Sequence, residues 1–305
     1  MPHAHSLIRG LASDIGGAVD APAPVPQVWH CRDTEFPPAL LDIPHPPQAV
    51  WTLGDRAVLD APCVAIVGTR QMTAYGERVT RRLGTALARA GACIVSGMAR
   101  GVDATAHRAA LEVGGRTVAV LGTGVDVPYP AGHRQLHGDI AASGLVLSEE
   151  APGARARPGC FPRRNRIIAG LARVTIVVEA GLRSGANSTA AAADAAHRQL
   201  AAVPGPIDSP QSAGCNRLIL DGAAIITCVN DALALVGLPQ EPEERPVLGE
   251  GEQKIWDVLG SEGAATVELL TARTALPLRE TLMALTSLEL DGRVTQDFAG
   301  AFRRR

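Results

Sequence analysis

Aromatic side chains are scarce in this chain of 305 residues, where Phe, Trp and Tyr together make up only 3%. Hydrophobic residues nevertheless reach 46%, so a core must be built mainly from Val, Ile, Leu and Ala. A chain of this length can form one large domain and a small one. Aliphatic residues favour a parallel sheet covered by helices over a β-sandwich.

Lysine is almost missing: of the 29 Lys and Arg residues, only Lys254 is a lysine. A uniform preference for Arg often reflects genomic base composition, so the preference alone says little about function. The net charge is −2, which gives no overall basic signal for nucleic acid. The informative feature is therefore where the arginines cluster.

Cysteine pairs and long apolar runs are also missing. The six cysteines contain no CxxC spacing, which argues against a zinc site and against a disulfide framework. The N-terminus has no apolar run long enough for a signal peptide, and no stretch approaches the ~20 apolar residues of a membrane span. We therefore expect a cytoplasmic protein with reduced thiols, no bound metal and no membrane partner.

Composition along the chain predicts four segments. Residues 1–34 are rich in Pro, Gly and Ala and are expected to be mobile. Residues 35–235 are expected to form the large domain. Residues 236–250 are rich in Pro and Glu, as linkers are. Residues 251–305 contain three short helical patterns followed by a hairpin, an order that resembles a winged helix.

Short apolar runs alternate with helical patterns in the large domain. Because each apolar run ends in a turn that leads to a helix, the pattern predicts an α/β fold with a doubly wound, mostly parallel sheet. The predicted strands are 64–67, 93–95, 117–122, 145–147, 174–178 and 200–203. The predicted helices are 75–90, 103–113 and 184–199.

Small and polar residues follow three of these strands, at 68–70, 96–97 and 122–124. Ligands of open parallel sheets bind beyond the carboxyl ends of the strands, where backbone amides and helix N-termini favour anions. The turns thus predict a phosphate-binding edge, although ordinary strand-to-helix turns use the same residue types. Since the GxGxxG and GxxxxGK[ST] motifs are missing, nicotinamide chemistry and ATP hydrolysis lack support and no cofactor is expected.

Residues 151–178 combine six arginines with Phe161 and contain no Asp or Glu. Several guanidinium groups can bind successive phosphates. An unpaired base can stack on an exposed ring for roughly 1–3 kcal/mol, whereas duplex DNA offers no such face. The pattern favours single-stranded DNA; the alternative is a core phenylalanine among solvated arginines. The arginines are Arg155, Arg157, Arg163, Arg164, Arg166 and Arg173.

Several long motifs resemble the DNA-processing protein A family (DprA, also called Smf), from about residue 35 to 228. They are VAIVGTR, IVSGMARGVDATAHRAAL, GLVLSEEAPG, FPRRNRIIAGLARVTIVVEA, SGANSTA and AVPGPI, in this order. The resemblance implies an extended Rossmann-like fold that forms a homodimer and is not an enzyme. It also implies binding and protection of single-stranded DNA during natural transformation, and loading of the RecA recombinase onto that strand.

The resemblance further implies which residues bind the strand. Arg70 would hold a phosphate and Phe161 would face a base. Asp103 and His107, four apart on one helix face, are expected to orient the turn at 96–100 rather than to catalyse a reaction. The implied DNA-binding residues are Gly68, Thr69, Arg70, Ser96, Gly97, Arg100, Phe161, Arg163, Arg164, Asn165, Arg166, Ser184, Gly185, Asn187 and Thr189.

Leu218 and Ile219 lie in the part of the chain that resembles the family's dimer and recombinase surfaces. They are candidates for the dimer interface, and packing of a short helix into the core is the alternative. The chain departs from the family in its first 35 residues, which leave room only for a remnant of a helical N-terminal domain. It departs again in residues 250–305, where nine acidic residues outnumber seven basic ones. Because a winged helix that reads DNA usually presents a basic helix, we expect this one to contact protein or to contribute weakly to DNA binding.

Two other functions stay open. Nucleotide-processing enzymes of the lysine-decarboxylase-like Rossmann group typically show PGGxGTxxE, but here the matching stretch, EAGLRSGANSTAAAAD, lacks the glutamate that would act on a ribose. Glu149, Glu150 and Glu179 lie near strand ends and are expected to bind loop amides or arginines. A third hypothesis, a module that senses a free nucleotide, is compatible with the same turns.

Overall fold

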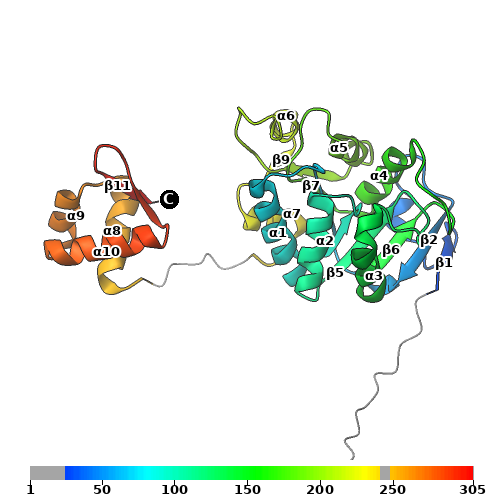
Figure 1. The fold of residues 1–305 in the computed structure, drawn as a ribbon, viewed down its shortest axis with the longest axis horizontal. Coiled ribbons are helices and arrows are strands. Elements are labelled where there is room, and N and C mark those ends of the chain that lie inside the picture. Colours follow the sequence, from blue (N-terminus) through cyan, green and yellow to red (C-terminus); the bar gives the residue numbers. More distant parts are fainter. Residues whose placement is uncertain (1–24, 241–247, 305) are drawn as a thin grey trace, which may run out of the picture. The chain divides into compact units, whose positions relative to one another are not determined.

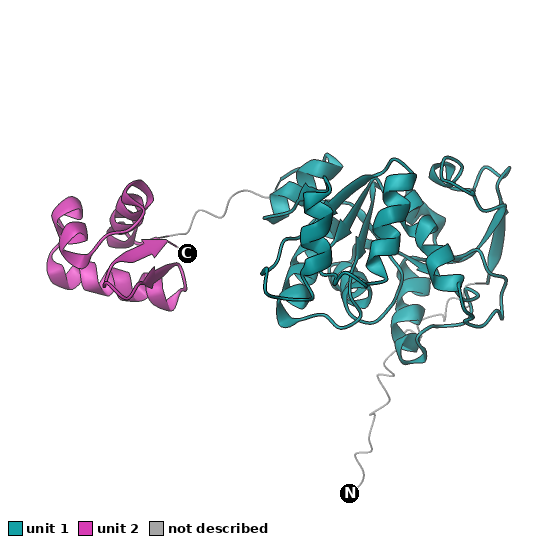
Figure 2. Ribbon diagram, turned by 90° about the horizontal axis from the view of Figure 1, so that it is seen from above, with its two compact units in different colours: residues 1–241 teal, residues 242–305 magenta. Residues whose placement is uncertain are grey.

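The computed structural model describes residues 25–240 and 248–304. The chain divides into two compact units, residues 1–241 and residues 242–305 (Figure 2). Residues 1–24, which belong to the segment predicted to be mobile, lie outside the described residues. So do residues 241–247, the middle of the predicted linker. Each unit contains a hydrophobic core of its own.

Nine strands, counted over the described residues, form the sheet at the centre of the first unit (Figure 1). Their order is β1-β2-β6-β5-β4-β3-β7-β8-β9. Neighbours from β6 to β9 pair in parallel, while β2 pairs antiparallel with both β1 and β6. The strands are β1 (Gln27–His30), β2 (Ala49–Gly54), β3 (Cys63–Val67), β4 (Cys93–Ser96), β5 (Arg116–Leu121), β6 (Leu145–Ser148), β7 (Val174–Val177), β8 (Gln199–Ala202) and β9 (Ala224–Ile225).

All six predicted strands are present, as β3 to β8. The sheet is larger than predicted because β1 and β2 add to it from the Pro-rich lead-in. β1 begins at Gln27, inside the segment predicted to be mobile. Pro26, Pro46 and Pro47 come before these strands rather than within them, so no backbone donor is lost from the strand pairing.

Helices cover both faces of this sheet. In β3, Ala65 and Val67 face one core, whereas Val64 and Ile66 face the other. Because both faces are buried, the strands are apolar throughout. One face carries α1 (Ala74–Arg89), α2 (Val102–Glu112), α3 (Arg134–Ser143) and α7 (Val229–Val236), of which the first three lie side by side in Figure 1. The other face carries α4 (Cys160–Leu171), α5 (Ala186–Ala195) and α6 (Ala213–Leu220).

The strand order reverses at β3, which lies between β4 and β7. The connections on the two sides of β3 lead to helices on opposite faces of the sheet, so the segments that leave β3 and β7 diverge. Such a reversal opens a crevice beyond the carboxyl ends of the strands, the usual place for a ligand in an open α/β sheet.

The second unit has the three helices and the hairpin predicted for a winged helix. Its core contains Ile255, Leu270 and Leu285. On α10, the exposed side chains Leu278, Leu282 and Met283 form a largely apolar surface. The elements are α8 (Glu250–Glu262), α9 (Val267–Thr274), α10 (Leu278–Leu290), β10 (Val294–Gln296) and β11 (Phe302–Arg304).

Membrane-spanning helices are not found in the described part of the chain, where no helix combines the necessary length with the necessary hydropathy. The same residues contain no group of three or more His, Cys, Asp or Glu side chains placed to hold a metal ion.

Candidate nucleic-acid interface

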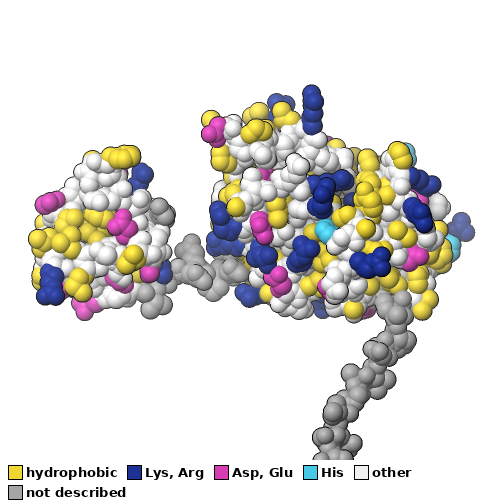
Figure 3. Space-filling model, in the orientation of Figure 1, with side chains coloured by type: hydrophobic (Ala, Val, Ile, Leu, Met, Phe, Trp, Pro, Cys, Tyr) yellow, Lys and Arg dark blue, Asp and Glu magenta, His cyan; other side chains and the backbone are white. Residues whose placement is uncertain are grey.

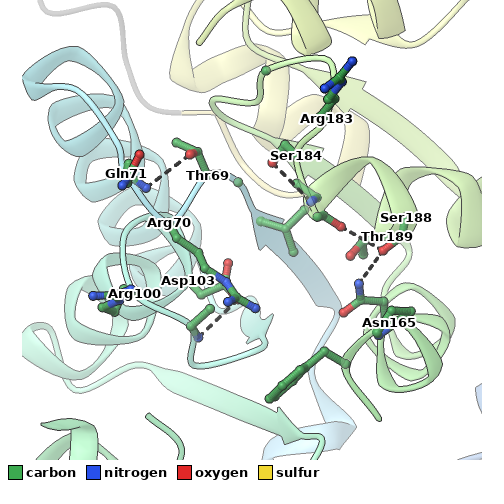
Figure 4. Close-up of a pocket in the computed structure, with 18 of the residues that line it drawn as sticks. Thr69, Arg70, Gln71, Arg100, Asp103, Asn165, Arg183, Ser184, Ser188 and Thr189 are labelled. Carbon is green, nitrogen blue, oxygen red and sulfur yellow. Dashed lines mark hydrogen bonds between the residues drawn. The ribbon is translucent and has the colours of Figure 1, made fainter. Parts of the chain in front are cut away.

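A cavity of about 770 Å³ opens at the crevice, and we call it the first cavity. The turns after β3 and β4, at 67–71 and 99–103, line one side. The loop after β7 with the start of α5, at 181–189, and the first turns of α4, at 161–168, line the other side (Figure 4). Segments far apart in the sequence thus meet where the strands end, as predicted.

Close backbone packing joins the turns after β3 and β4. Gly101 has a φ of 77°, and a Cβ atom there would lie 2.3 Å from the carbonyl oxygen of Thr69. Only glycine therefore allows this approach. Met98 in the same turn has a φ of 56°, which few non-glycine residues adopt, and its side chain is fully buried. These contacts fix the backbone of the turn, and with it the position from which the exposed side chain of Arg100 extends.

Asp103 orients the turn after β4, as predicted. Its carboxylate accepts hydrogen bonds from the backbone amides of Gly97 at 3.1 Å and Ala99 at 3.4 Å. Burial raises the pKa of Asp103, and the nearby guanidinium of Arg164 opposes that rise. Because the amide of Gly97 already has an acceptor, it is not free for a phosphate.

His107, one turn further along α2, is a core residue. Its Nδ1 lies 2.7 Å from the hydroxyl of Thr117, which itself donates to the carbonyl of Ile94, so Nδ1–H is the donor of the pair. Burial, followed by the positive charges of Arg164 and other neighbours, lowers the pKa of His107 to about 3. His107 therefore stays neutral and fastens α2 to the sheet.

Arg70 and Phe161 face the same cavity from different segments. Phe161 opens α4 with its ring partly exposed, so it is not a core residue. Arg70 is exposed and reaches into the cavity from the turn after β3 (Figure 4), with its Cζ 5.7 Å from the centroid of the Phe161 ring. A cation and an aromatic face are thus available side by side.

Arg164 and Asn165 also line the cavity, but both are buried. Arg164 donates to the carbonyl of Gly97 at 2.8 Å and to that of Val120, which ties α4 to the ends of β4 and β5. Burial lowers the pKa of Arg164 to about 10, so the group remains charged at neutral pH. Asn165 donates to the hydroxyl of Ser188 at 2.6 Å, which joins α4 to α5.

Two predicted wall residues do not line the first cavity. Arg163 pairs with Glu149 at 3.0 Å and with Glu150 at 3.5 Å, and Arg166 pairs with Glu149 at 2.5 Å. Arg157 pairs with Glu150 at 2.7 Å. Glu149 and Glu150 thus bind arginines, as expected, and although residues 151–178 contain no Asp or Glu, three of their arginines have a counter-charge from the two glutamates just before the stretch.

Ser96 and Asn187 support the backbone instead of lining the cavity. Ser96 is fully buried and donates to the carbonyl of Ile66 at 2.6 Å. Asn187 donates to the carbonyls of Gly181 at 3.1 Å and Leu182 at 2.8 Å, which closes the loop after β7. The predicted residues that do line the first cavity are Gly68, Thr69, Arg70, Arg100, Phe161, Arg164, Asn165, Ser184, Gly185 and Thr189.

Four further polar residues line the cavity and were not predicted: Gln71, Arg183, Ser188 and Gln211. Arg183 directly precedes the predicted Ser184, and Ser188 lies between the predicted Asn187 and Thr189, so their position gave a usable signal. Gln211 lies in a loop without a motif. With these additions the described lining residues include four arginines and a single carboxylate, Asp103.

The predicted dimer residues Leu218 and Ile219 are only partly exposed, and they pack against the core of the sheet. Much of the surface of these two side chains is therefore used for core packing, which was the alternative to a dimer contact. The neighbouring side chains of Leu220 and Ile225 are 75% and 49% exposed. They present more apolar surface to solvent than the predicted pair.

Comparison with known proteins assigns a family to this chain. Residues 27–237 match the family described as DNA recombination-mediator protein A, and residues 239–298 match the DprA winged helix domain. The chain therefore belongs to the DNA recombination-mediator protein A family, as the sequence motifs predicted.

Bacterial relatives are similar over most of the chain. The DprA relative of Mycobacterium tuberculosis is 46% identical over 258 residues, which cover 81% of this chain and 66% of the relative. The chain thus spans just under two thirds of that relative's length. Protein Smf of Escherichia coli is 37% identical over 285 residues, or 90% of this chain and 76% of Smf.

Solved structures of the family share the fold. The crystal structure of DNA processing protein A from Streptococcus pneumoniae has a TM-score of 0.65 and 40% identity, and covers 68% of this chain and 73% of its own. That of Helicobacter pylori DNA processing protein A, which concerns its single-stranded DNA binding mode, has a TM-score of 0.62 and 33% identity over 68% of this chain and 94% of its own. The predicted fold, a Rossmann-like α/β unit with a C-terminal winged helix, is confirmed.

Proposed function

We propose that this protein binds single-stranded DNA in the first cavity and serves DNA processing. The observation that carries the proposal is the pairing of exposed Arg70 with the partly exposed ring of Phe161. A guanidinium binds a phosphate, and a ring stacks on a base that is not held in a duplex. The Helicobacter pylori relative, whose structure concerns single-stranded DNA binding, supports the same ligand.

Binding would protect an incoming strand in the cytoplasm during natural transformation and allow RecA to be loaded onto it. We further propose that the protein acts as a homodimer. The exposed side chains of Leu220, at the end of α6, and Ile225, in the edge strand β9, offer an apolar surface for such a contact. Membership of the DNA recombination-mediator protein A family supports the proposed role in recombination and the proposed homodimer.

The proposed role is not enzymatic. A nucleotide-processing enzyme would need a free carboxylate at the cavity. Glu179 is buried and accepts a hydrogen bond from the amide of Thr73 at 2.9 Å. Asp103 is held by the amides of Gly97 and Ala99. Both carboxylates are thus engaged in supporting turns, which favours binding over hydrolysis.

Fluorescence anisotropy with oligo-dT, a matched duplex and a mononucleotide over a salt series tests the proposal. We expect tight binding of the single strand that weakens steeply with salt. Phe161→Ala should lose roughly 1–3 kcal/mol of binding free energy, and Arg70→Ala should lower the salt slope by about one. Arg82→Ala, an exposed arginine of α1 outside the cavity, is the matched control.

Equal affinity for duplex and single strand would count against the proposal. So would wild-type affinity in both Arg70→Ala and Phe161→Ala. Release of free base from a nucleoside monophosphate would instead support the alternative, an enzyme of the lysine-decarboxylase-like group.

A further inference from the structure

A second cavity, of about 560 Å³, adjoins the first across Phe161. Phe161 and the arginines Arg70, Arg100 and Arg164 line both cavities. The second cavity extends from there to the exposed side of α2 and to the loop at 129–133. The residues that line it alone are Gly97, Arg108, Tyr129, Pro130, Gly132 and His133.

Charge favours the second cavity as the continuation of a DNA-binding groove. Four arginines line it, and its described lining residues include no Asp or Glu. Within the described part of the chain, neither Arg100 nor Arg108 has an ion-pair partner. On the face shown in Figure 3, basic side chains gather over α2 and α3. A phosphate could therefore bind here without displacing a carboxylate.

A third cavity, which shares no lining residue with the first, is less favourable for a phosphate. This cavity is lined by Arg163 and Arg166 together with Glu149, which pairs with both. A phosphate that approached either arginine would be repelled by this carboxylate or would have to break the existing ion pairs. Charge, together with the lining residues that the first and second cavities share, thus favours the second cavity as the place where the strand continues.

An aromatic surface continues from the first cavity into the second. The ring of Tyr129 lies 4.9 Å from that of Phe161, at an interplanar angle of 33°, and the residue is 39% exposed. Hydrogen bonds hold the loop that carries it: His137 contacts the carbonyl of Val125 at 2.7 Å, and His133 contacts the carbonyl of Met98 at 2.9 Å. Tyr129 is therefore a fixed platform, and a base can stack on it at little cost in ordering.

We propose that the second cavity binds the nucleotide adjacent to the one in the first cavity. Its base stacks on Tyr129 and its phosphate binds Arg108, so that the strand crosses Phe161 toward α2 and not along Arg163. This inference rests on the proposed function of the first cavity and adds the direction in which the strand continues.

A length series of oligo-dT, from the mononucleotide to about eight nucleotides, tests the inference in the full chain. Competition anisotropy gives the affinity for each length. Tyr129→Leu and Arg108→Gln should leave mononucleotide affinity within about twofold of wild type, and should each weaken binding of longer strands at least about fivefold. Tyr129→Phe keeps the ring and should bind like wild type. Arg163→Gln is the matched control for charge and should change affinity by less than about twofold.

The outcomes separate this inference from the function on which it rests. If wild type binds no single strand, or neither Arg70→Ala nor Phe161→Ala weakens binding, the proposed function fails. If Phe161→Ala weakens binding while Tyr129→Leu and Arg108→Gln match wild type at every length, only the second cavity is overturned. A loss in Arg163→Gln as large as that in Arg108→Gln would also overturn the inferred path.

Discussion

Arginines that are close in sequence have different roles at the first cavity. Arg164 is buried under it and bonded to carbonyls of β4 and β5, whereas Arg163 is exposed and paired with Glu149. The reason is geometric, because successive residues of a helix point about 100° apart. The sequence could predict a basic stretch here, but not which side chain faces the ligand, since that depends on the rotation of α4.

Ser96 illustrates the same limit. It was predicted as a donor because it ends a strand at the ligand-binding edge of the sheet. Neighbouring side chains of a strand point to opposite faces, and that of Ser96 points into the interior, where it bonds to Ile66. In contrast, Gly68, Thr69 and Arg70 lie beyond the end of β3, where no strand constrains their direction, and all three line the cavity.

Gly101 should be the glycine least tolerant of substitution near the site. Alanine there would have to adopt a φ of 77° and would clash with the carbonyl of Thr69. We expect Gly101→Ala to destabilise the fold by more than about 1 kcal/mol and to weaken binding of single-stranded DNA. Urea denaturation and anisotropy measure the two effects.

Gly114, at the other end of α2, is the matched control for this substitution. It has a φ of 65°, but a Cβ atom there would meet no described atom within 4 Å. Gly114→Ala should therefore cost stability through backbone strain alone and leave DNA affinity unchanged. Equal effects of the two substitutions on DNA affinity would contradict the role given to the contact between Gly101 and Thr69.

Among the elements, the buried parallel strands were the easiest to predict. Each is a short run of apolar residues bounded by small or polar ones, and both faces are covered. α4 was not predicted as a helix, because it buries Arg164 and Asn165 on the face where an apolar stripe would be expected. The buried polar contacts of α4 thus obscured its secondary structure.

The free energy of unfolding should depend on pH because of His107, which is buried on α2. Its folded pKa of about 3 lies below the value of an unfolded histidine, about 6.5, so the unfolded state takes up a proton first as the pH falls. Stability from this group is complete above about pH 6.5 and is lost below it. Between about pH 7.5 and about pH 5 the loss amounts to about 2 kcal/mol.

His107→Gln provides the measurement of this effect. The variant should be less stable than wild type at neutral pH, because the core loses a fitted ring, but its free energy of unfolding should fall less on acidification. Urea denaturation at both pH values gives the difference, which we expect to be about 2 kcal/mol smaller in the variant. An unchanged pH dependence would mean that His107 takes up a proton as readily in the folded protein as in the unfolded chain, which would contradict the lowered pKa.

At the scale of the whole molecule, net charge is a poor guide to the ligand. The chain carries a net −2, yet the described residues of the first cavity include four arginines and one carboxylate. The second unit does not share this bias: α10 carries one arginine, Arg279, and two acidic residues, Glu280 and Glu289. The two units therefore differ in what they can offer to DNA.

Removal of residues 242–305 should leave single-strand affinity within about twofold of the full chain. All described residues of both cavities belong to the first unit, which has its own core. Anisotropy with oligo-dT compares the two proteins, and Phe161→Ala in the shortened chain checks that the same site is being measured. A loss of tenfold or more would assign DNA contacts to the winged helix.

Photocrosslinking locates the bound strand most directly. An oligonucleotide with 5-iododeoxyuridine at each position in turn is irradiated in complex with the full chain, and the crosslinked peptides are identified by mass spectrometry. A base stacked on an aromatic ring crosslinks efficiently, so we predict crosslinks in the peptides that contain Phe161 and Tyr129. Crosslinks confined to α6, to α7 or to residues 248–304 would contradict a binding site at the ends of β3, β4 and β7.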